Sequence, residues 1–293
     1  MTTQSEVADS RRPRGSLADL VGNISYEVMP FKSVERAVLD DVPTSIPLTV
    51  TVTEAKGIDT TLDFTERLMK HGYTVTPHLP ARQFVDDDHV REVVDRLSTA
   101  GVRSVFVVGG DAPKPAGRFH DAHTLLQAMS ELDHPFSELG IGGYPEGHAN
   151  IPQSDLELAL KKKAPLATRI LTQICFDATT TANWAADVGR SGIDLPIYVG
   201  MPGPVNRQKL MRISAGIGLG QSARFLQKQQ NLLWRFLLPG GYNPTKLVRR
   251  LGSAVPKVRS NVRGLHIFTF NEIRKTEEWR RKLLASVSEK DKR

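Results

Sequence analysis

Residues 88–108 read DHVREVVDRLSTAGVRSVFVV, and this stretch contains one complete helix-to-strand step. Its first part, residues 88–100, places apolar residues at helical spacing, which predicts an amphipathic helix. Gly101 follows, in the position where a left-handed residue commonly ends a helix. Residues 104–108 then carry almost no polarity, as expected for a strand buried on both faces of a parallel sheet.

The same step recurs along the chain. Eight short apolar or β-branched runs predict strands, and five stretches between them show helical periodicity. The predicted strands are residues 23–29, 48–53, 74–78, 104–108, 139–143, 170–174, 195–199 and 265–270, and the helices are residues 60–70, 88–100, 120–132, 154–163 and 179–190. Eight such steps favour an α/β fold that is a single closed (β/α)8 TIM barrel over a doubly wound sheet.

The barrel is expected to occupy residues 19–285. Residues 1–18 are polar and predict a disordered N-terminal arm without the apolar core of a secretory signal. Two extra helices, at residues 222–237 and 244–251, are expected between strands seven and eight. A closing helix is predicted at residues 272–285, and residues 286–293 read as a charged C-terminal tail.

Composition excludes several classes of protein. The 293 residues are 40% hydrophobic and 24% charged, an ordinary balance for a globular domain. The net charge of +7 comes from short scattered basic groups, so no nucleic-acid partner is predicted. No apolar run is long enough to span a bilayer, so no membrane partner is predicted. The single cysteine, Cys175, argues against a disulfide framework and for the reducing cytoplasm.

Active sites of such barrels lie at the carboxyl ends of the strands, and polar residues gather there in this sequence. Glu27 is the most informative of them, because it interrupts the apolar strand at residues 24–29. Burial would favour the protonated form of its carboxyl, which suits a general acid. An outward-facing side chain or a structural salt bridge is the alternative.

Several motifs in register resemble the methylenetetrahydrofolate reductase family. YEVMP at residues 26–30 resembles its F-E-F-F-P-P signature, and GYPEGH at residues 143–148 its A-Y-P-E-x-H. LTQ at residues 171–173 with FD at 176–177 is similar to I-T-Q-x-x-F-D, and HIFTFN at residues 266–271 to H-F-Y-T-L-N. The resemblance covers residues 23 to about 284.

The resemblance implies reduction of 5,10-methylenetetrahydrofolate to 5-methyltetrahydrofolate, with NADH or NADPH as hydride donor. Glu27 takes the place of the general acid that protonates N10, and Asp111 that of a catalytic aspartate that stabilises the cationic iminium. Asp111, Gln173 and Asn206 are the implied substrate contacts. Each of these two residues also has a purely structural alternative. Asp111 could serve only to form a loop turn, and Gln173 could be a hydrogen-bonded amide in the barrel core.

The resemblance also marks positions that surround the family's flavin. They are Thr53, His78, Gly110, Tyr144, His148 and Lys162. Two departures matter, because Glu54 replaces an aromatic residue and Gly109 replaces an arginine. A carboxylate gained and a cation lost should weaken binding of an anionic dinucleotide. We therefore do not expect tightly bound FAD, and a nicotinamide dinucleotide is assigned to the same groove.

Other functions stay open at this point. A conventional FAD-dependent reductase and a non-catalytic folate-binding barrel fit most of the same residues. A metal-dependent hydrolase could use Glu27, His78, Asp111 and His148, but without an H-x-H pair no metal site is predicted. The sequence does not choose between NADH and NADPH, and it is compatible with a homo-oligomer.

Overall fold

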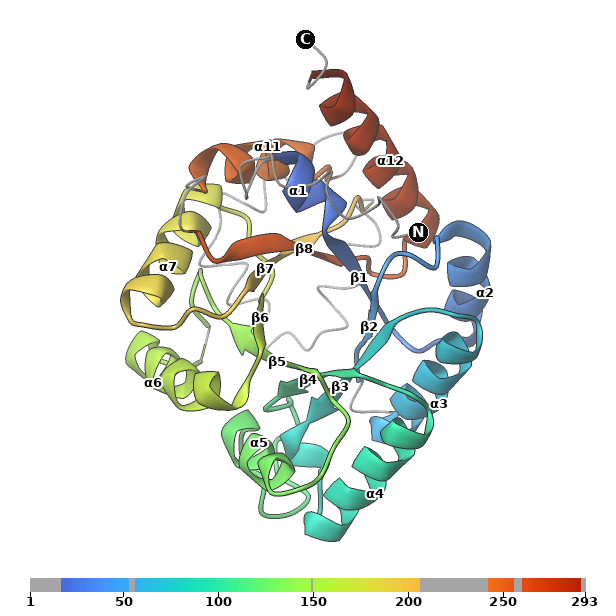
Figure 1. Cartoon of the computed structure of the whole chain (residues 1–293), viewed down its shortest axis with the longest axis vertical. Helices are drawn as coiled ribbons and strands as arrows, with labels where there is room; N and C mark the ends of the chain where they lie inside the picture. The colour runs from blue at the N-terminus through green and yellow to red at the C-terminus, as the bar shows by residue number, and fades with distance from the viewer. Residues whose placement is uncertain (1–16, 53–55, 149, 206–241, 256–259, 291–293) are drawn as a thin grey trace, which may run out of the picture.

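A computed structural model describes residues 17–52, 56–148, 150–205, 242–255 and 260–290. Eight parallel strands form a closed barrel in chain order, with β8 paired to β1 (Figure 1). The predicted (β/α)8 barrel is confirmed. The strands are β1 (Ile24–Val28), β2 (Leu48–Val50), β3 (Val75–Pro80), β4 (Ser104–Val108), β5 (Glu138–Gly143), β6 (Arg169–Thr172), β7 (Ile197–Pro202) and β8 (Val262–Phe268).

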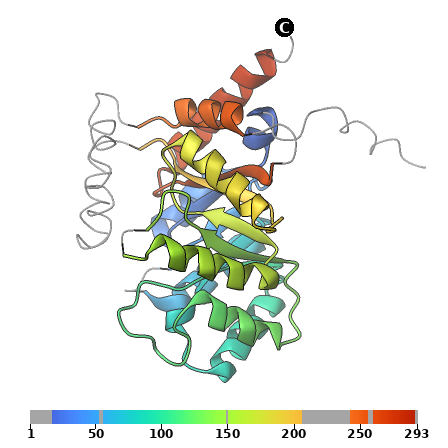
Figure 2. The same ribbon diagram turned by 90° about the vertical axis from the view of Figure 1, so that its left-hand side faces the viewer.

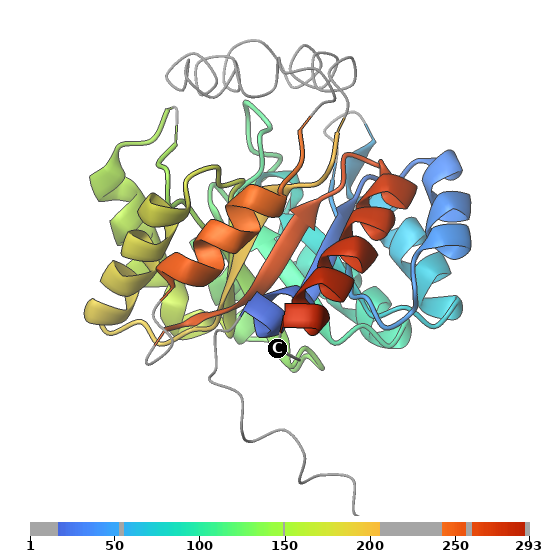
Figure 3. The same ribbon diagram turned by 90° about the horizontal axis from the view of Figure 1, so that it is seen from above.

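Helices surround the strands on the outside of the barrel (Figures 1 and 3). They are α1 (Leu17–Gly22), α2 (Lys32–Asp41), α3 (Gly57–Lys70), α4 (Asp87–Thr99), α5 (Ala122–Ser130), α6 (Gln153–Lys163), α7 (Ala178–Arg190), α11 (Thr245–Ala254) and α12 (Ile273–Lys290), with short 3-10 turns η1 (Ala81–Gln83) and η2 (Ala164–Leu166). Figure 2 shows α6 and α7 side by side on the outer surface. No helix in these described ranges combines the length and apolar character needed to cross a bilayer.

Most predicted elements lie within a few residues of the observed ones. The predicted extra helix at residues 244–251 corresponds to α11, whereas residues 222–237 lie outside the described residues, as do residues 1–16 of the predicted arm. Helices α1 and α2 were not predicted. Helix α12 continues to Lys290, so the predicted end at residue 285 is too early.

Alternation along β1 decides which side chains reach the inside of the barrel. Ile24, Tyr26 and Val28 are buried, and the Tyr26 hydroxyl donates to Glu277 Oε2 of α12 at 2.8 Å. This face of β1 therefore points outward, against the helices. Because successive side chains of a strand point to opposite faces, Ser25 and Glu27 point into the barrel.

The loops that follow the carboxyl ends of the strands form the mouth of the barrel, and several helices begin directly after these loops. Three of the helices have an aspartate as the N-cap residue. The carboxylates of Asp86, Asp121 and Asp177 accept the backbone N–H groups of the third residues after them, at α4, α5 and α7. Each such cap is worth about 1 kcal/mol of helix stability. The caps also fix where the loops after β3, β4 and β6 end.

Candidate active site at the mouth of the barrel

The carboxyl group of Glu27 lies between two imidazoles inside the barrel. Its Oε2 atom is 3.6 Å from Nε2 of His78 on β3 and 3.5 Å from Nε2 of His266 on β8. The Glu27 side chain keeps 16% of its surface exposed, so it remains reachable from the mouth. The outward-facing alternative for Glu27 is therefore wrong, because its carboxyl lies inside the barrel beside these two imidazoles.

His78 lies beside Glu27 and is buried. Its ring packs edge-on against Phe106, with the ring centroids 4.8 Å apart. Burial lowers the pKa of His78 to about 4; electrostatic interaction with Glu27 opposes this shift, and that with His266 adds to it. The imidazole is therefore neutral near pH 7, and its Nε2 has no hydrogen-bond partner among the described residues.

A second cluster forms at the ends of β4 and β5. Asp111 is exposed in the loop after β4. The rings of Tyr144 and His148, in the loop after β5, meet edge to face with centroids 5.6 Å apart. Burial raises the pKa of Tyr144, and the nearby charge of Asp111 raises it too. Burial lowers the pKa of His148 while Asp111 opposes that shift. The structure thus brings together three of the predicted site residues.

Gly110 allows this loop to approach β3 closely. Its φ is +87°, and a Cβ on it would lie 2.9 Å from Cβ of Pro80. Only glycine tolerates both conditions at once. Arg82, just beyond β3, donates its backbone N–H to the Gly109 carbonyl at 3.0 Å, which fixes the two loops to each other.

Gln173 is the first residue after β6 and is exposed at the mouth. Its Oε1 accepts the N–H of Ile174 at 2.8 Å, and its backbone N–H donates to the Gly143 carbonyl at 2.8 Å. The alternative of a buried core amide is therefore wrong. β6 ends at Thr172, two residues before the predicted end, so Gln173 lies beyond the strand.

Glu146 ties the loop after β5 to the loop that carries Gln173. Its Oε1 accepts the backbone N–H groups of Phe176 at 2.6 Å and Asp177 at 2.8 Å. Oε2 is buried and has no hydrogen-bond partner in the described ranges. Burial raises the pKa of Glu146, while the two N–H donors lower it. In the sequence Glu146 stands only as a member of the GYPEGH motif, and no role for it could be predicted from that.

One predicted site residue in the described ranges, Lys162, is not brought to this mouth. Lys162 is exposed in the last turn of α6. Helix α6 leads back from the mouth over 11 residues, which is about 16 Å, so its last turn lies toward the opposite end of the barrel. Thr53 and Asn206 lie outside the described residues.

The turn after β8 holds the backbone beside Glu27. The Thr269 hydroxyl donates to the Glu27 carbonyl at 2.6 Å, and Asn271 Oδ1 accepts the N–H of Met29 at 2.9 Å. Phe270 and Asn271 have positive φ values of 49° and 60°. Two successive non-glycine residues in the left-handed region are uncommon and cost free energy, which is typical of functional sites.

Ser25 and His266 were likewise not predicted as site residues. His266 interrupts the apolar strand β8 in the same way that Glu27 interrupts β1, and this signal could have identified it. The residue that it meets could not be identified that way, because Glu27 and His266 are 239 positions apart.

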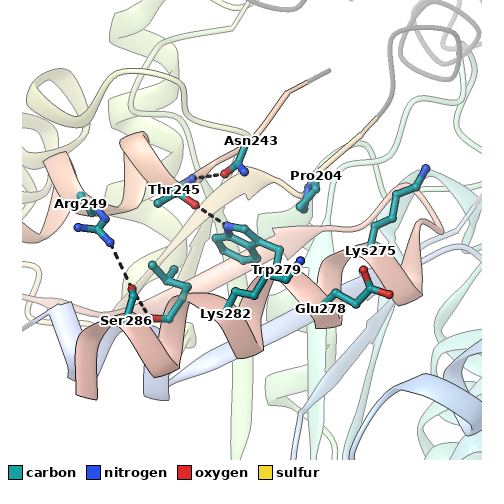
Figure 4. Close-up of a pocket in the computed structure, with 10 residues that line it drawn as sticks. Pro204, Asn243, Thr245, Arg249, Lys275, Glu278, Trp279, Lys282 and Ser286 are labelled. Atoms are coloured by element: carbon teal, nitrogen blue, oxygen red, sulfur yellow. Dashed lines mark hydrogen bonds between the residues drawn. The ribbon is translucent and has the colours of Figure 1, made fainter. Parts of the chain in front are cut away.

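A separate hollow lies on the outside of the barrel, between α11 and α12 (Figure 4). Its volume is about 340 Å³, and three basic residues, Arg249, Lys275 and Lys282, contribute to its lining. Across it, the Trp279 indole N–H donates to the Thr245 hydroxyl at 2.9 Å. None of the predicted site residues lines this hollow, so the candidate active site stays at the barrel mouth.

The metal-dependent alternative lacks support in the described ranges, where no group of three or more His, Cys, Asp or Glu side chains could hold a metal ion.

Comparison with known proteins is more decisive. A family model described as methylenetetrahydrofolate reductase matches residues 19–218. This chain belongs to that family.

Two curated relatives support the same family. Methylenetetrahydrofolate reductase 2 of Saccharomyces cerevisiae is 27% identical over a 123-residue alignment that covers 38% of this chain and 20% of the yeast protein. A probable methylenetetrahydrofolate reductase (NADPH) of Caenorhabditis elegans is 24% identical over a 200-residue alignment that covers 66% of this chain and 28% of the nematode protein. The matches thus span less than a third of either relative.

One solved structure shows the fold alone. The C-terminal domain of a putative chitinase from Desulfitobacterium hafniense has a TM-score of 0.50 at 11% identity, over 90% of this chain and 99% of that one.

Proposed function

We propose that this methylenetetrahydrofolate reductase family member reduces 5,10-methylenetetrahydrofolate to 5-methyltetrahydrofolate with NADH or NADPH as hydride donor. The observation that carries the proposal is the position of Glu27. A carboxyl group inside the barrel, reachable from the mouth and flanked by two imidazoles, suits proton donation to a bound substrate.

In this proposal Glu27 gives a proton to N10 of the folate, and the C–N10 bond breaks. The five-membered ring opens to a cationic N5 iminium. Asp111, exposed at the same mouth, supplies a negative charge that stabilises this cation. Gln173 offers an amide to the pterin from the end of β6. The nicotinamide supplies the hydride that reduces the iminium carbon to a methyl group.

The side chains at the mouth favour a transient dinucleotide over a tightly held one. The charged groups next to Tyr144 and the β6 loop are carboxylates, namely Asp111 and Glu146. The position where the family has an arginine is Gly109, whose carbonyl is bonded to the Arg82 N–H. These residues do not fit a stably bound anionic FAD. A nicotinamide dinucleotide leaves in every turnover, so weaker binding suffices.

Glu27→Gln tests the proposal. Losing a general acid should lower kcat by roughly 10²–10⁴-fold, while folate affinity in equilibrium titrations stays close to that of the wild type. Glu138→Gln is the matched control, because Glu138 begins β5 at the opposite end of the barrel and pairs with Arg169. Full turnover by Glu27→Gln would refute the assignment. A wild-type protein that binds folate without turnover would instead be a folate-binding barrel.

A further inference from the structure

His266 occupies a place from which it can hold the Glu27 carboxyl. It is 1% exposed, and β8 pairs with β1 in a register that sets His266 opposite Ser25. The Ser25 hydroxyl lies 2.9 Å from Nδ1 of His266, and Nε2 of His266 lies 3.5 Å from Oε2 of Glu27. Three side chains from two neighbouring strands thus form one chain of polar contacts inside the barrel.

The chemistry of the three groups gives this chain a direction. An ionised carboxylate can only accept hydrogen bonds, so His266 must carry its hydrogen on Nε2 to donate to Glu27. In a neutral imidazole Nδ1 is then an acceptor, and the Ser25 hydroxyl can donate to it. Because a serine hydroxyl can also accept, the carboxylate of Glu27 dictates the tautomer, and Ser25 anchors the His266 ring through Nδ1. The 3.5 Å separation is at the outer limit of a hydrogen bond, and such contacts often tighten when substrate binds.

We propose that Ser25 and His266 are positioning residues for Glu27, with Ser25 anchoring the His266 ring through Nδ1 and the His266 Nε2–H orienting the carboxyl. The proposal rests on the proposed function in one respect, because it takes Glu27 as the acid of that reaction. It also assigns a use to a buried histidine and a half-buried serine that the reaction itself does not require.

Two titratable side chains in the described part of the chain face the Glu27 carboxyl: His78 from β3 and His266 from β8. They differ in how they are held. Nε2 of His78 makes no hydrogen bond within the described residues, and the His78 ring rests on Phe106. His266 is fixed through its second nitrogen by Ser25. His266 is therefore the imidazole whose orientation is set independently of Glu27.

The pH profile of kcat separates positioning from mere packing. A donor to the ionised carboxylate favours that form, so removing the donor lets Glu27 keep its proton to higher pH. Because the acid must be protonated to act, the alkaline limb of the profile in His266→Leu should move up by about one pH unit, with a lower kcat. Ser25→Ala should show a smaller shift in the same direction. His266→Gln, whose amide restores a donor, should return the limb toward its wild-type position.

Ser104→Ala is the matched control for Ser25→Ala. Ser104 is a buried barrel hydroxyl on β4 whose hydrogen bonds in the described residues go to Thr76 and Arg169, not to Glu27. Its loss should leave the alkaline limb in place. An unmoved limb in a folded His266→Leu protein would overturn the proposal. So would an equal shift in Ser104→Ala, because general loosening of the barrel would then explain the result.

The tautomer gives a second readout that needs no turnover. In ¹⁵N NMR spectra of the full-length protein at pH 7, we expect His266 to carry a hydrogen on Nε2 and none on Nδ1. The sequence has eight histidines, and the signal lost in His266→Gln identifies this one. An Nδ1–H tautomer would overturn the proposal even in an active enzyme. Conversely, an inactive wild-type protein with the expected tautomer would refute the proposed function and leave the Ser25–His266 pair intact.

Discussion

Replacing Asn271 should reveal how much strain is stored in the turn that holds β1. Asn271 sits at φ 60°, and its Oδ1 accepts the Met29 N–H at 2.9 Å. Alanine in the left-handed region costs about 1–2 kcal/mol, and losing the hydrogen bond costs about 1 kcal/mol more. Asn271→Ala should therefore lower the free energy of unfolding by about 2–3 kcal/mol.

Two further variants separate the backbone from the side chain. Asn271→Gly removes the conformational penalty but loses the hydrogen bond and adds freedom to the unfolded chain, so its cost should be about 1–2 kcal/mol. Asn271→Asp keeps the acceptor and should cost less than about 1 kcal/mol. Since the turn holds the backbone at Glu27, kcat should fall in the same order: aspartate, glycine, alanine.

Denaturant unfolding measures these differences, and Asn261→Ala is the control. Asn261 donates from Nδ2 to the Ile193 carbonyl at 2.9 Å, and it is not among the residues with positive φ. The Asn261→Ala variant therefore loses one comparable hydrogen bond without relieving or adding backbone strain. If Asn271→Ala costs no more than Asn261→Ala, the turn after β8 stores no strain and the reasoning fails.

Three other predictions concern groups outside the reaction. Tyr26→Phe removes the buried hydrogen bond to Glu277 and should cost about 1–2 kcal/mol in urea unfolding without moving KM, whereas a neutral effect would show that the bond is not needed. Cys175 is buried, with its pKa raised to about 12 by burial, so the native protein should resist iodoacetamide at pH 8 until it is unfolded. Burial lowers the pKa of Lys163 to about 8, so the unfolded chain binds more protons between pH 8 and 10.5. The wild type should therefore gain about 2 kcal/mol relative to Lys163→Met as pH rises from 7 to 10, and a constant difference would contradict the shift.

The barrel could be predicted from the sequence because its strands are almost entirely apolar runs, and glycines such as Gly101 mark the ends of the helices before them. Residues 104–108 match β4 at both ends. Helix α2 was not predicted, because Phe31 before it provides no side-chain cap and because few of its residues are buried. Helix α12 runs beyond its predicted end, since the charged residues near the C-terminus are as compatible with an exposed helix as with a tail.

The site could be predicted only in part, for a physical reason. Strand ends are readable from sequence, so Glu27, Asp111 and Gln173 could be expected at one mouth. Which side chains meet inside the barrel depends on the register between strands distant in sequence. The pairing of Ser25 with His266 across β1 and β8 is of this kind. The backbone N–H groups that meet Glu146 are likewise unreadable without the loop conformations.

The most direct test of the central claim is to purify the full chain, record its visible spectrum, and follow NADH and NADPH oxidation with 5,10-methylenetetrahydrofolate without added flavin. The account predicts a colourless protein that oxidises one of the two donors and forms 5-methyltetrahydrofolate in equal amount. A yellow protein, or activity only after FAD is added, would contradict direct hydride transfer. The absence of 5-methyltetrahydrofolate under both conditions would contradict the proposed reaction itself.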